Sequence, residues 1–163
     1  MNPTTRTYPT ANSLDVTIRA EMIGILNQHL ADSFDLYSQS KQAHWNVKGM
    51  NFIALHKLFD EIAEAVEPII DELGERVTAL GADAQGTVRM AAENSRLPEF
   101  PGDLDTGEQF VEATRDRVAM FANSAREAAN KAMEAGDEAT GDLFIEITRE
   151  MDNLNYFLEA HLR

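Results

Sequence analysis

Residues 44–81 read HWNVKGMNFIALHKLFDEIAEAVEPIIDELGERVTALG and combine a helical pattern with histidines and carboxylates. Over residues 52–80 its apolar residues recur at helical spacing, which predicts one long amphipathic helix. Gly81 stands where a glycine commonly ends a helix. Two of the four histidines, His44 and His56, lie in the same stretch, and carboxylates follow them at spacings of four residues. Two interpretations arise: a metal site, or the solvated polar face of a core helix.

Upstream of this stretch, a second helical pattern runs over residues 15–48. Asn12 and Ser13 precede it, and both are residue types that commonly cap a helix N-terminus. Residues 1–13 contain two prolines and several threonines but no apolar run, so we expect a flexible N-terminal arm. The folded domain is then predicted to span residues 14–163.

Downstream, a short helix is predicted over residues 87–93, inside a long connection that prolines and a glycine mark as a loop. Another long helix is predicted over residues 106–135, because TGEQ at its start fits a capping box and Gly136 follows its last turn. The last helix begins near Asp137 and continues almost to the C-terminus. Four long helices with one long crossover between the second and third predict an all-α fold, a ferritin-like four-helix bundle with a short helix in the crossover.

The composition limits what such a bundle can do. With 163 residues, of which 44% are hydrophobic, the chain suits a single domain with a sizeable core. The absence of cysteine excludes a disulfide framework, a thiolate metal site and a cysteine nucleophile. The net charge of −14 attracts cations and repels phosphate backbones. No run reaches the roughly 18 apolar residues of a membrane span, so we expect a soluble, cytoplasmic protein.

Four potential metal ligands share one side of the predicted helix over residues 52–80. At about 100° per residue they fall near 0°, 40°, 60° and 100° around its axis, in the order His56, Asp60, Asp71 and Glu75. Asp60 and Asp71 are nevertheless about 16 Å apart along the axis, too far to bind one ion from a straight helix. One chain alone therefore cannot assemble these ligands around a single ion.

An antiparallel two-fold pairing of this helix with its copy removes the distance problem. His56 and Asp60 of one chain would then face Asp71 and Glu75 of the other, which gives two equivalent sites. His44 would add a second imidazole if the first helix packs beside the second. Mixed imidazole and carboxylate ligands suit Fe, Zn or Mn better than Ca or Mg.

Spacing by itself does not exclude the interpretation that these carboxylates form a solvated polar face, because carboxylates four residues apart are common on helices of acidic proteins. The two remaining histidines, His29 and His161, fall outside the pattern. We expect both to be ordinary interfacial or surface residues.

The motifs HW at residues 44–45, LHxxFD at 55–60 and DxxxER at 71–76 resemble those of the Dps family, the mini-ferritins named as DNA-binding proteins from starved cells. The resemblance extends over nearly the whole chain, including the short helix in the crossover. It implies a homododecameric hollow shell that oxidises Fe(II) with hydrogen peroxide or oxygen and stores ferric mineral inside. Such a protein is a ferroxidase, an oxidoreductase acting on metal ions, and protects against oxidative stress.

The same resemblance implies roles for individual residues. Ferroxidase ligands between two-fold-related subunits correspond here to the set that the spacing also indicates: His44, His56, Asp60, Asp71 and Glu75. Trp45 is either an electron donor beside the iron or an aromatic residue that fills the subunit contact, and burial is the more common role. An acidic channel for ion uptake corresponds to the start of the last helix, with the candidates Asp137, Glu138, Asp142 and Glu146. Helix-dipole stabilisation alone explains the first two.

Two features of the sequence refine this expectation. No Glu-x-x-His motif is present, which argues against a di-iron site inside one bundle and favours the version between subunits. Pro68 lies within the predicted ligand helix and removes a backbone hydrogen bond, so we expect a kink between the two ligand pairs.

Two functions of other classes compete with iron oxidation. DNA binding, which the family name suggests, needs basic arms or patches, and the N-terminal arm carries only Arg6. We therefore expect no direct DNA binding. The other alternative is a structural shell with zinc at the same site, because ligand type does not determine which metal is bound.

Overall fold

The computed structural model describes residues 5–163, and within that range every regular element is a helix. The helices follow the predicted order along the chain: α1 (Val16–Asn46), α2 (Phe52–Ala79), α3 (Val88–Asn94), α4 (Gly107–Ala135) and α5 (Glu138–Ala160). The predicted all-α fold, with a short helix in the long crossover, is confirmed. No helix among residues 5–163 combines the length and apolar character needed to span a bilayer.

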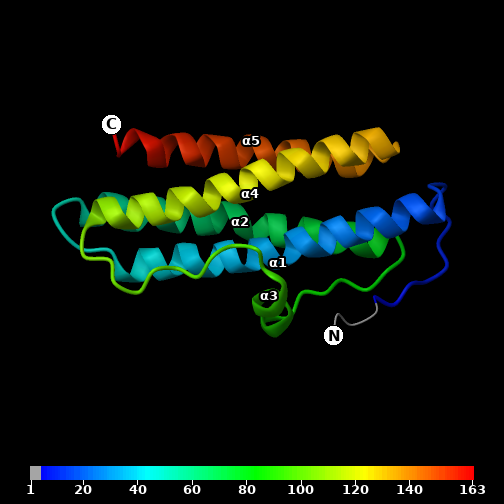
Figure 1. Cartoon of the computed structure of the whole chain (residues 1–163), viewed down its shortest axis with the longest axis horizontal. Helices are drawn as coiled ribbons and strands as arrows, with labels where there is room; N and C mark the ends of the chain where they lie inside the picture. The colour runs from blue at the N-terminus through cyan, green and yellow to red at the C-terminus, as the bar shows by residue number, and fades with distance from the viewer. Residues whose placement is uncertain (1–4) are drawn as a thin grey trace.

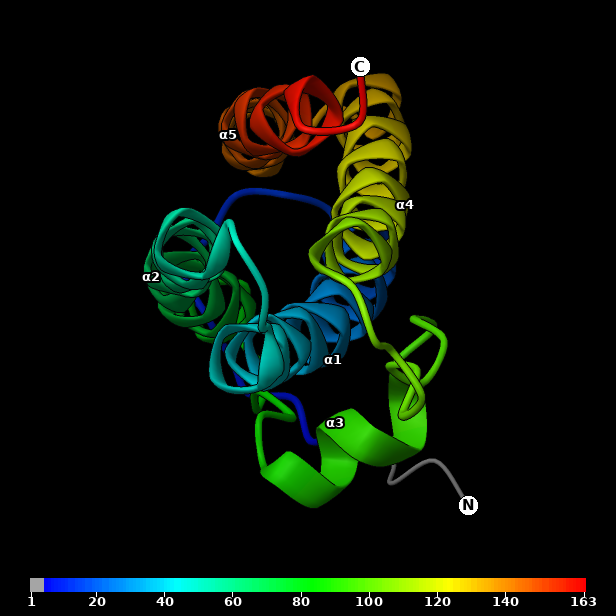
Figure 2. The same cartoon turned by 90° about the vertical axis from the view of Figure 1, so that its left-hand side faces the viewer.

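The four long helices form a bundle of two neighbouring antiparallel pairs. α1 lies beside α2, and α4 lies beside α5. Figure 2, which views the bundle from one end, shows α3 outside the bundle next to α1. The pairing of α1 with α2 matters most for function, because these two helices carry all five predicted ligands.

α1 begins close to the predicted residue 15, but its N-cap differs from the prediction. Asp15 is the N-cap, and its carboxylate accepts a hydrogen bond from the Thr17 amide at 2.7 Å. Asn12, a predicted cap, instead accepts from the Leu14 amide at 2.9 Å in the turn before the helix. An Asn side chain can satisfy either kind of amide, so the sequence alone did not separate a cap from a turn.

The other helix ends follow the sequence signals. Thr106 and Gln109 form the predicted capping box at the start of α4. Gly136 ends the helix with φ = 84°, a left-handed conformation that glycine adopts at no steric cost. α2 continues without a break through Pro68, whose ring lies on the exposed side of the helix.

Residues 5–8 of the predicted N-terminal arm run beside the segment that follows α2. The amide of Tyr8 donates to the Gly81 carbonyl at 2.7 Å, and the Asp83 amide donates to the Arg6 carbonyl at 3.0 Å. Gly81 has φ = 89°, and a Cβ at this position would lie 2.9 Å from the Tyr8 carbonyl oxygen. Residues 1–4 lie outside the described residues, and the flexibility of the arm stays a prediction.

Polar side chains of α1 hold the irregular crossover in place. Asp32 is only 2% exposed and accepts from the backbone amide of Arg96 at 2.8 Å and from its Nε at 2.9 Å. Gln39 donates to the Pro98 carbonyl at 3.0 Å. These side chains satisfy backbone groups that have no helical partner, so the irregular residues after α3 pack against α1.

His29 is a core residue, contrary to the prediction of an interfacial or surface histidine. It is 3% exposed, and its ring centroid lies 4.7 Å from that of Phe144 in an edge-on contact. Nδ1 donates to the Ile25 carbonyl at 2.8 Å, and Nε2 lies 3.4 Å from Nη2 of Arg96. Because both ring nitrogens find partners, the imidazole is accommodated between α1, α4 and α5. His161 is exposed, as predicted.

We expect His29 to make the fold less stable in acid. Burial lowers the pKa of His29; the hydrogen bond to the Ile25 carbonyl opposes this in part, and the nearby Arg96 guanidinium lowers the pKa further. The unfolded chain therefore binds this proton first, so the free energy of unfolding falls as pH decreases below about 6.5. The free energy of unfolding of His29→Gln, measured with urea between pH 7.5 and 5, should lack this part of the pH dependence. His161→Gln should keep it, and an equal slope in all three proteins would contradict the assignment.

Candidate metal centre

His44 and His56 form a reciprocal pair between the end of α1 and the start of α2. Nδ1 of His44 lies 2.6 Å from the backbone carbonyl oxygen of His56, and Nδ1 of His56 lies 2.8 Å from that of His44. The rings stack with centroids 3.7 Å apart. The Val47–Asn51 segment between the helices allows this close antiparallel contact, because it reverses the chain within five residues.

These hydrogen bonds determine the tautomer of both imidazoles. A carbonyl oxygen can only accept, so each Nδ1 must carry the proton and donate it. Each Nε2 then keeps its lone pair, and neither Nε2 has a hydrogen-bond partner among residues 5–163. Metal-binding histidines commonly have this arrangement, in which one ring nitrogen donates to a carbonyl and the other is free to bind the metal. Here these are Nδ1 and Nε2.

Asp60 lies next to this pair and is held by Lys41. The Lys41 ammonium forms an ion pair with Oδ1 of Asp60, and the same oxygen lies 3.9 Å from Nδ1 of His44. The hydrogen bond from Lys41 lowers the pKa of Asp60, which favours the ionised carboxylate. Sequence reasoning missed Lys41. Its position three residues before His44, on the same side of α1, was the available signal.

Asp71 and Glu75 lie further along α2 and do not join this cluster. Both are exposed and line a wide groove of about 690 Å³, whose other walls include the apolar side chains of Leu30, Phe34 and Ile70. Among residues 5–163, no three His, Asp or Glu side chains of one chain are arranged to hold a metal ion. In the part of the chain that it describes, the structure therefore places His44, His56 and Asp60 near one another without the arrangement of a metal site, and it leaves Asp71 and Glu75 in a separate groove.

Trp45 follows His44 and is 66% exposed in the single chain. It lines a pocket of about 380 Å³ between α1 and α3, together with Tyr37, Lys41 and Val88. Val88 is also largely exposed. Large apolar side chains at the surface of a monomer commonly mark a contact with another molecule.

Asp137 occupies a different environment from the other three candidate channel residues. It is 2% exposed, and its Oδ1 accepts from Nη2 of Arg76 at 2.7 Å and from the Thr140 amide at 3.1 Å. A channel lining needs an exposed carboxylate, whereas this one caps α5 and pairs with α2. Asp137 is therefore a structural residue, which corrects its predicted place in the channel.

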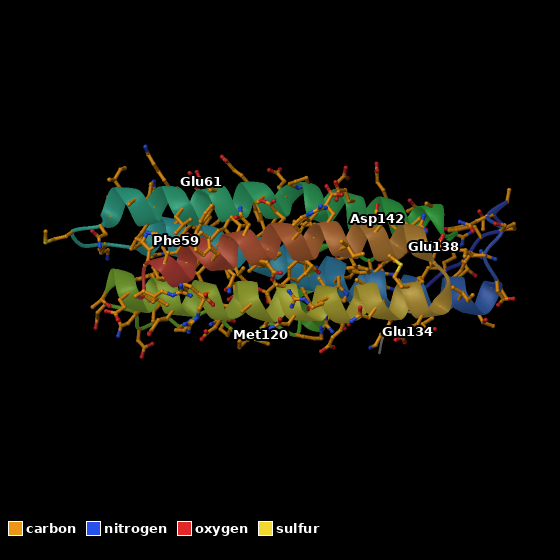
Figure 3. The ribbon with its side chains drawn as sticks, turned by 90° about the horizontal axis from the view of Figure 1, so that it is seen from above. Phe59, Glu61, Met120, Glu134, Glu138 and Asp142 are labelled. Carbon is orange, nitrogen blue, oxygen red and sulfur yellow. The ribbon has the colours of Figure 1, made fainter. Side chains whose placement is uncertain are left out.

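Glu138, Asp142 and Glu146 are exposed on α5. Figure 3 shows Glu138 and Asp142 near Glu134, at the end of the bundle where α4 turns into α5. Glu146 also approaches α2. Burial raises the pKa of Glu72 on that helix, and the charge of Glu146 raises it further. This part of the surface therefore carries a concentrated negative charge that favours cations.

Comparisons with known proteins agree with this architecture. The ferritin-like domain family matches residues 23–163. The DNA protection during starvation protein of Agrobacterium fabrum is 37% identical over 158 residues, which cover 97% of this chain and 98% of that protein. DpsC from Streptomyces coelicolor superposes with a TM-score of 0.89 at 29% identity, covering 98% of this chain and 92% of that one.

A third relative adds a description of the superfamily. The Dps protein from Vibrio cholerae superposes with a TM-score of 0.87 at 28% identity, covering 97% of this chain and all of the other. It is described as a member of a broad superfamily of ferritin-like diiron-carboxylate proteins. The fold, the match over nearly the whole chain and the shared helix order all support the same family assignment. The chain belongs to the ferritin-like family and, within it, to the Dps proteins.

Proposed function

We propose that this protein is a ferroxidase that oxidises Fe(II), preferably with hydrogen peroxide, at sites shared by two subunits. The observation that carries the proposal is the histidine pair, whose Nε2 atoms are both free, next to the ionised carboxylate of Asp60, which lies 3.9 Å from Nδ1 of His44. Membership of a ferritin-like diiron-carboxylate superfamily supports iron as the metal. In this proposal His44, His56 and Asp60 of one chain would form one half of the site and leave room in the coordination sphere for ligands from another chain and for the oxidant.

The remaining ligands in this proposal are Asp71 and Glu75 of a two-fold partner. Their groove is open and partly apolar, and the histidine half of the site carries the exposed side chain of Trp45 nearby. An antiparallel dimer would place each half against the other and cover both surfaces. The ferric product gains charge on oxidation, and carboxylate ligands stabilise it. Twelve such subunits would enclose the oxidised iron as mineral.

An anaerobic Fe(II) titration followed by peroxide tests the function. We expect saturable Fe(II) binding, fast oxidation after peroxide is added, and a ferric core that stays with the protein on gel filtration. Native mass spectrometry should give a dodecamer. A monomer or a 24-mer, or Fe(II) oxidation no faster than in buffer, would refute the proposal.

The same assays separate the two alternative functions. A structural zinc shell would bind Zn(II) tightly and leave the rate of Fe(II) oxidation unchanged. A DNA-binding protein would retard plasmid DNA in a gel-shift assay, with the salt dependence that phosphate contacts cause. With a net charge of −14, we expect no retardation at neutral pH and moderate salt in the absence of added metal.

We expect Lys41→Gln to strengthen Fe(II) binding. Lys41 neutralises Asp60 and competes with a cation for the same oxygen. Both side chains are partly exposed, so the competition is modest, and we expect about a twofold to fivefold gain in Fe(II) affinity. Without Lys41 the pKa of Asp60 returns upward, so the acid limb of the binding curve should move to higher pH.

Lys57→Gln is the matched control for this experiment. Lys57 follows His56 on the exposed side of α2 and forms no ion pair within residues 5–163, yet the substitution removes the same charge. The control should leave affinity and its pH dependence close to those of the wild type. If both variants gain affinity equally, net charge rather than the contact with Asp60 is responsible.

We further propose that Fe(II) reaches the interior through a channel lined by Asp142 and Glu146. Both carboxylates are exposed, and Glu72 adds to the negative charge around them. Replacing both by Asn and Gln should slow iron uptake at low Fe(II) severalfold, since an acidic channel concentrates cations. Stopped-flow uptake measured on shells of unchanged mass checks this, and unchanged kinetics would remove the assignment.

A further inference from the structure

Tyr37 lies on α1 beside the part of α2 that separates the two halves of the proposed site. Lys41 contacts Asp60, and α1 and α2 run antiparallel, so earlier residues of α1 lie next to later residues of α2. Tyr37 comes four residues before Lys41 and is therefore about 6 Å further along the bundle in the direction of Asp71. It is half-buried and packs against the core.

The two cavities next to the proposed site both include Tyr37 in their walls. The wide groove contains Tyr37 together with Asp71 and Glu75. The smaller pocket contains it together with Lys41 and Trp45. Phe34 also lines both cavities, but a benzene ring is far harder to oxidise than a phenol. Tyr37 is thus a redox-active side chain that lines both the groove of Asp71 and Glu75 and the pocket of Lys41, the ion-pair partner of Asp60.

The reduction of hydrogen peroxide can require an electron that such a side chain is able to supply. Breaking the O–O bond of hydrogen peroxide to water and hydroxide takes two electrons, and one Fe(II) ion supplies only one. A site that holds two Fe(II) ions meets this demand. A site that holds a single Fe(II) ion needs a second donor, or a hydroxyl radical is released.

We propose that Tyr37 supplies the second electron when peroxide reacts at a site that holds a single Fe(II) ion, an inference that rests on the proposed ferroxidase function. In this step Fe(II) becomes Fe(III) and the phenol becomes a neutral tyrosyl radical. The O–O bond breaks, one oxygen leaves as hydroxide, and the other takes the phenolic hydrogen and leaves as water. One ferrous ion, one phenol and one peroxide thus give one ferric ion, one phenoxyl radical, one hydroxide and one water.

The chain offers a clean assignment of this radical, because it contains only three tyrosines, Tyr8, Tyr37 and Tyr156. Assembled protein is loaded anaerobically with one Fe(II) per site, mixed with peroxide and freeze-quenched for EPR spectroscopy. We expect a tyrosyl signal that narrows when the protein is grown on ring-deuterated tyrosine. The signal should disappear in Tyr37→Phe, and a variant with Tyr8→Phe and Tyr156→Phe should keep it in full. This second variant makes the assignment even if Tyr37→Phe fails to assemble.

The outcomes distinguish this inference from the proposed function. If Fe(II) is oxidised quickly but the tyrosyl signal is absent, persists in Tyr37→Phe or is lost from the double variant, Tyr37 is not the donor and the ferroxidase function stands. A signal that does not narrow with deuterated tyrosine and is lost in Trp45→Phe would assign the electron to Trp45 and overturn the inference. If peroxide does not accelerate Fe(II) oxidation, both proposals fail.

Discussion

Mixed shells built from two inactive parents should regain about a quarter of the wild-type rate of peroxide-dependent Fe(II) oxidation. One parent subunit carries His56→Ala with Asp60→Ala, and the other carries Asp71→Ala with Glu75→Ala. Each homogeneous shell lacks one half of every site. Because loss of a group that only supports a ligand already costs 10- to 100-fold, removing two ligands should cost at least about a hundredfold.

The expected recovery follows from the two-fold geometry. Random assembly from equal amounts makes about half of all dimers mixed, and each mixed dimer holds one complete site and one site without either half. The rate is measured by stopped-flow after the mixed dimers have been demonstrated by native mass spectrometry. If shells with proven mixed dimers stay as inactive as their parents, the ligands do not meet across a two-fold axis. A site shared by two subunits would then not explain why Asp71 and Glu75 lie apart from the histidine cluster.

Asp137→Ala should destabilise the protein by about 3–5 kcal/mol, because it leaves the Arg76 guanidinium without its buried partner. The same change removes the N-cap of α5, since the Asp137 carboxylate accepts from the Thr140 amide. Urea unfolding monitored by circular dichroism measures the loss. Asp137→Asn, which keeps a capping oxygen but removes the charge, should fall between Asp137→Ala and the wild type.

Glu138→Ala is the matched control for this prediction. Glu138 is the next residue, is exposed, and was predicted with Asp137 as part of the same acidic channel. Its substitution should change the free energy of unfolding by no more than about 0.5 kcal/mol. Equal and small effects of both substitutions would mean that the contact with Arg76 contributes little, and Asp137 would return to the channel candidates.

The helical architecture was predictable because its signals are local. Apolar spacing, the capping box at Thr106 and the glycines Gly81 and Gly136 each act within a few residues of the chain. The N-cap of α1 was predicted wrongly for the same local reason, since Asn12 and Asp15 are both good acceptors for a backbone amide. Only the packed structure shows which of the two caps the helix.

The candidate site was predictable in part. The 3.6-residue period of a helix was enough to predict that His56, Asp60, Asp71 and Glu75 share one side of α2. The rise per residue was enough to predict that Asp60 and Asp71 are too distant to bind one ion within a chain. The tertiary structure decided which groups surround them. The contact of Lys41 with Asp60 and the reciprocal hydrogen bonds of His44 and His56 depend on the antiparallel register of α1 and α2.

The burial of polar side chains was decided by tertiary structure alone. His29 and Asp137 are residue types that were expected at the surface, yet both are buried. Their partners, Arg96 and Arg76, lie 67 and 61 positions away in the sequence. A helical pattern tells which face of a helix is apolar, but not which polar residue will meet a partner on another helix. Burying a polar group is costly unless such a partner satisfies it, and here the packing of distant segments supplies that partner.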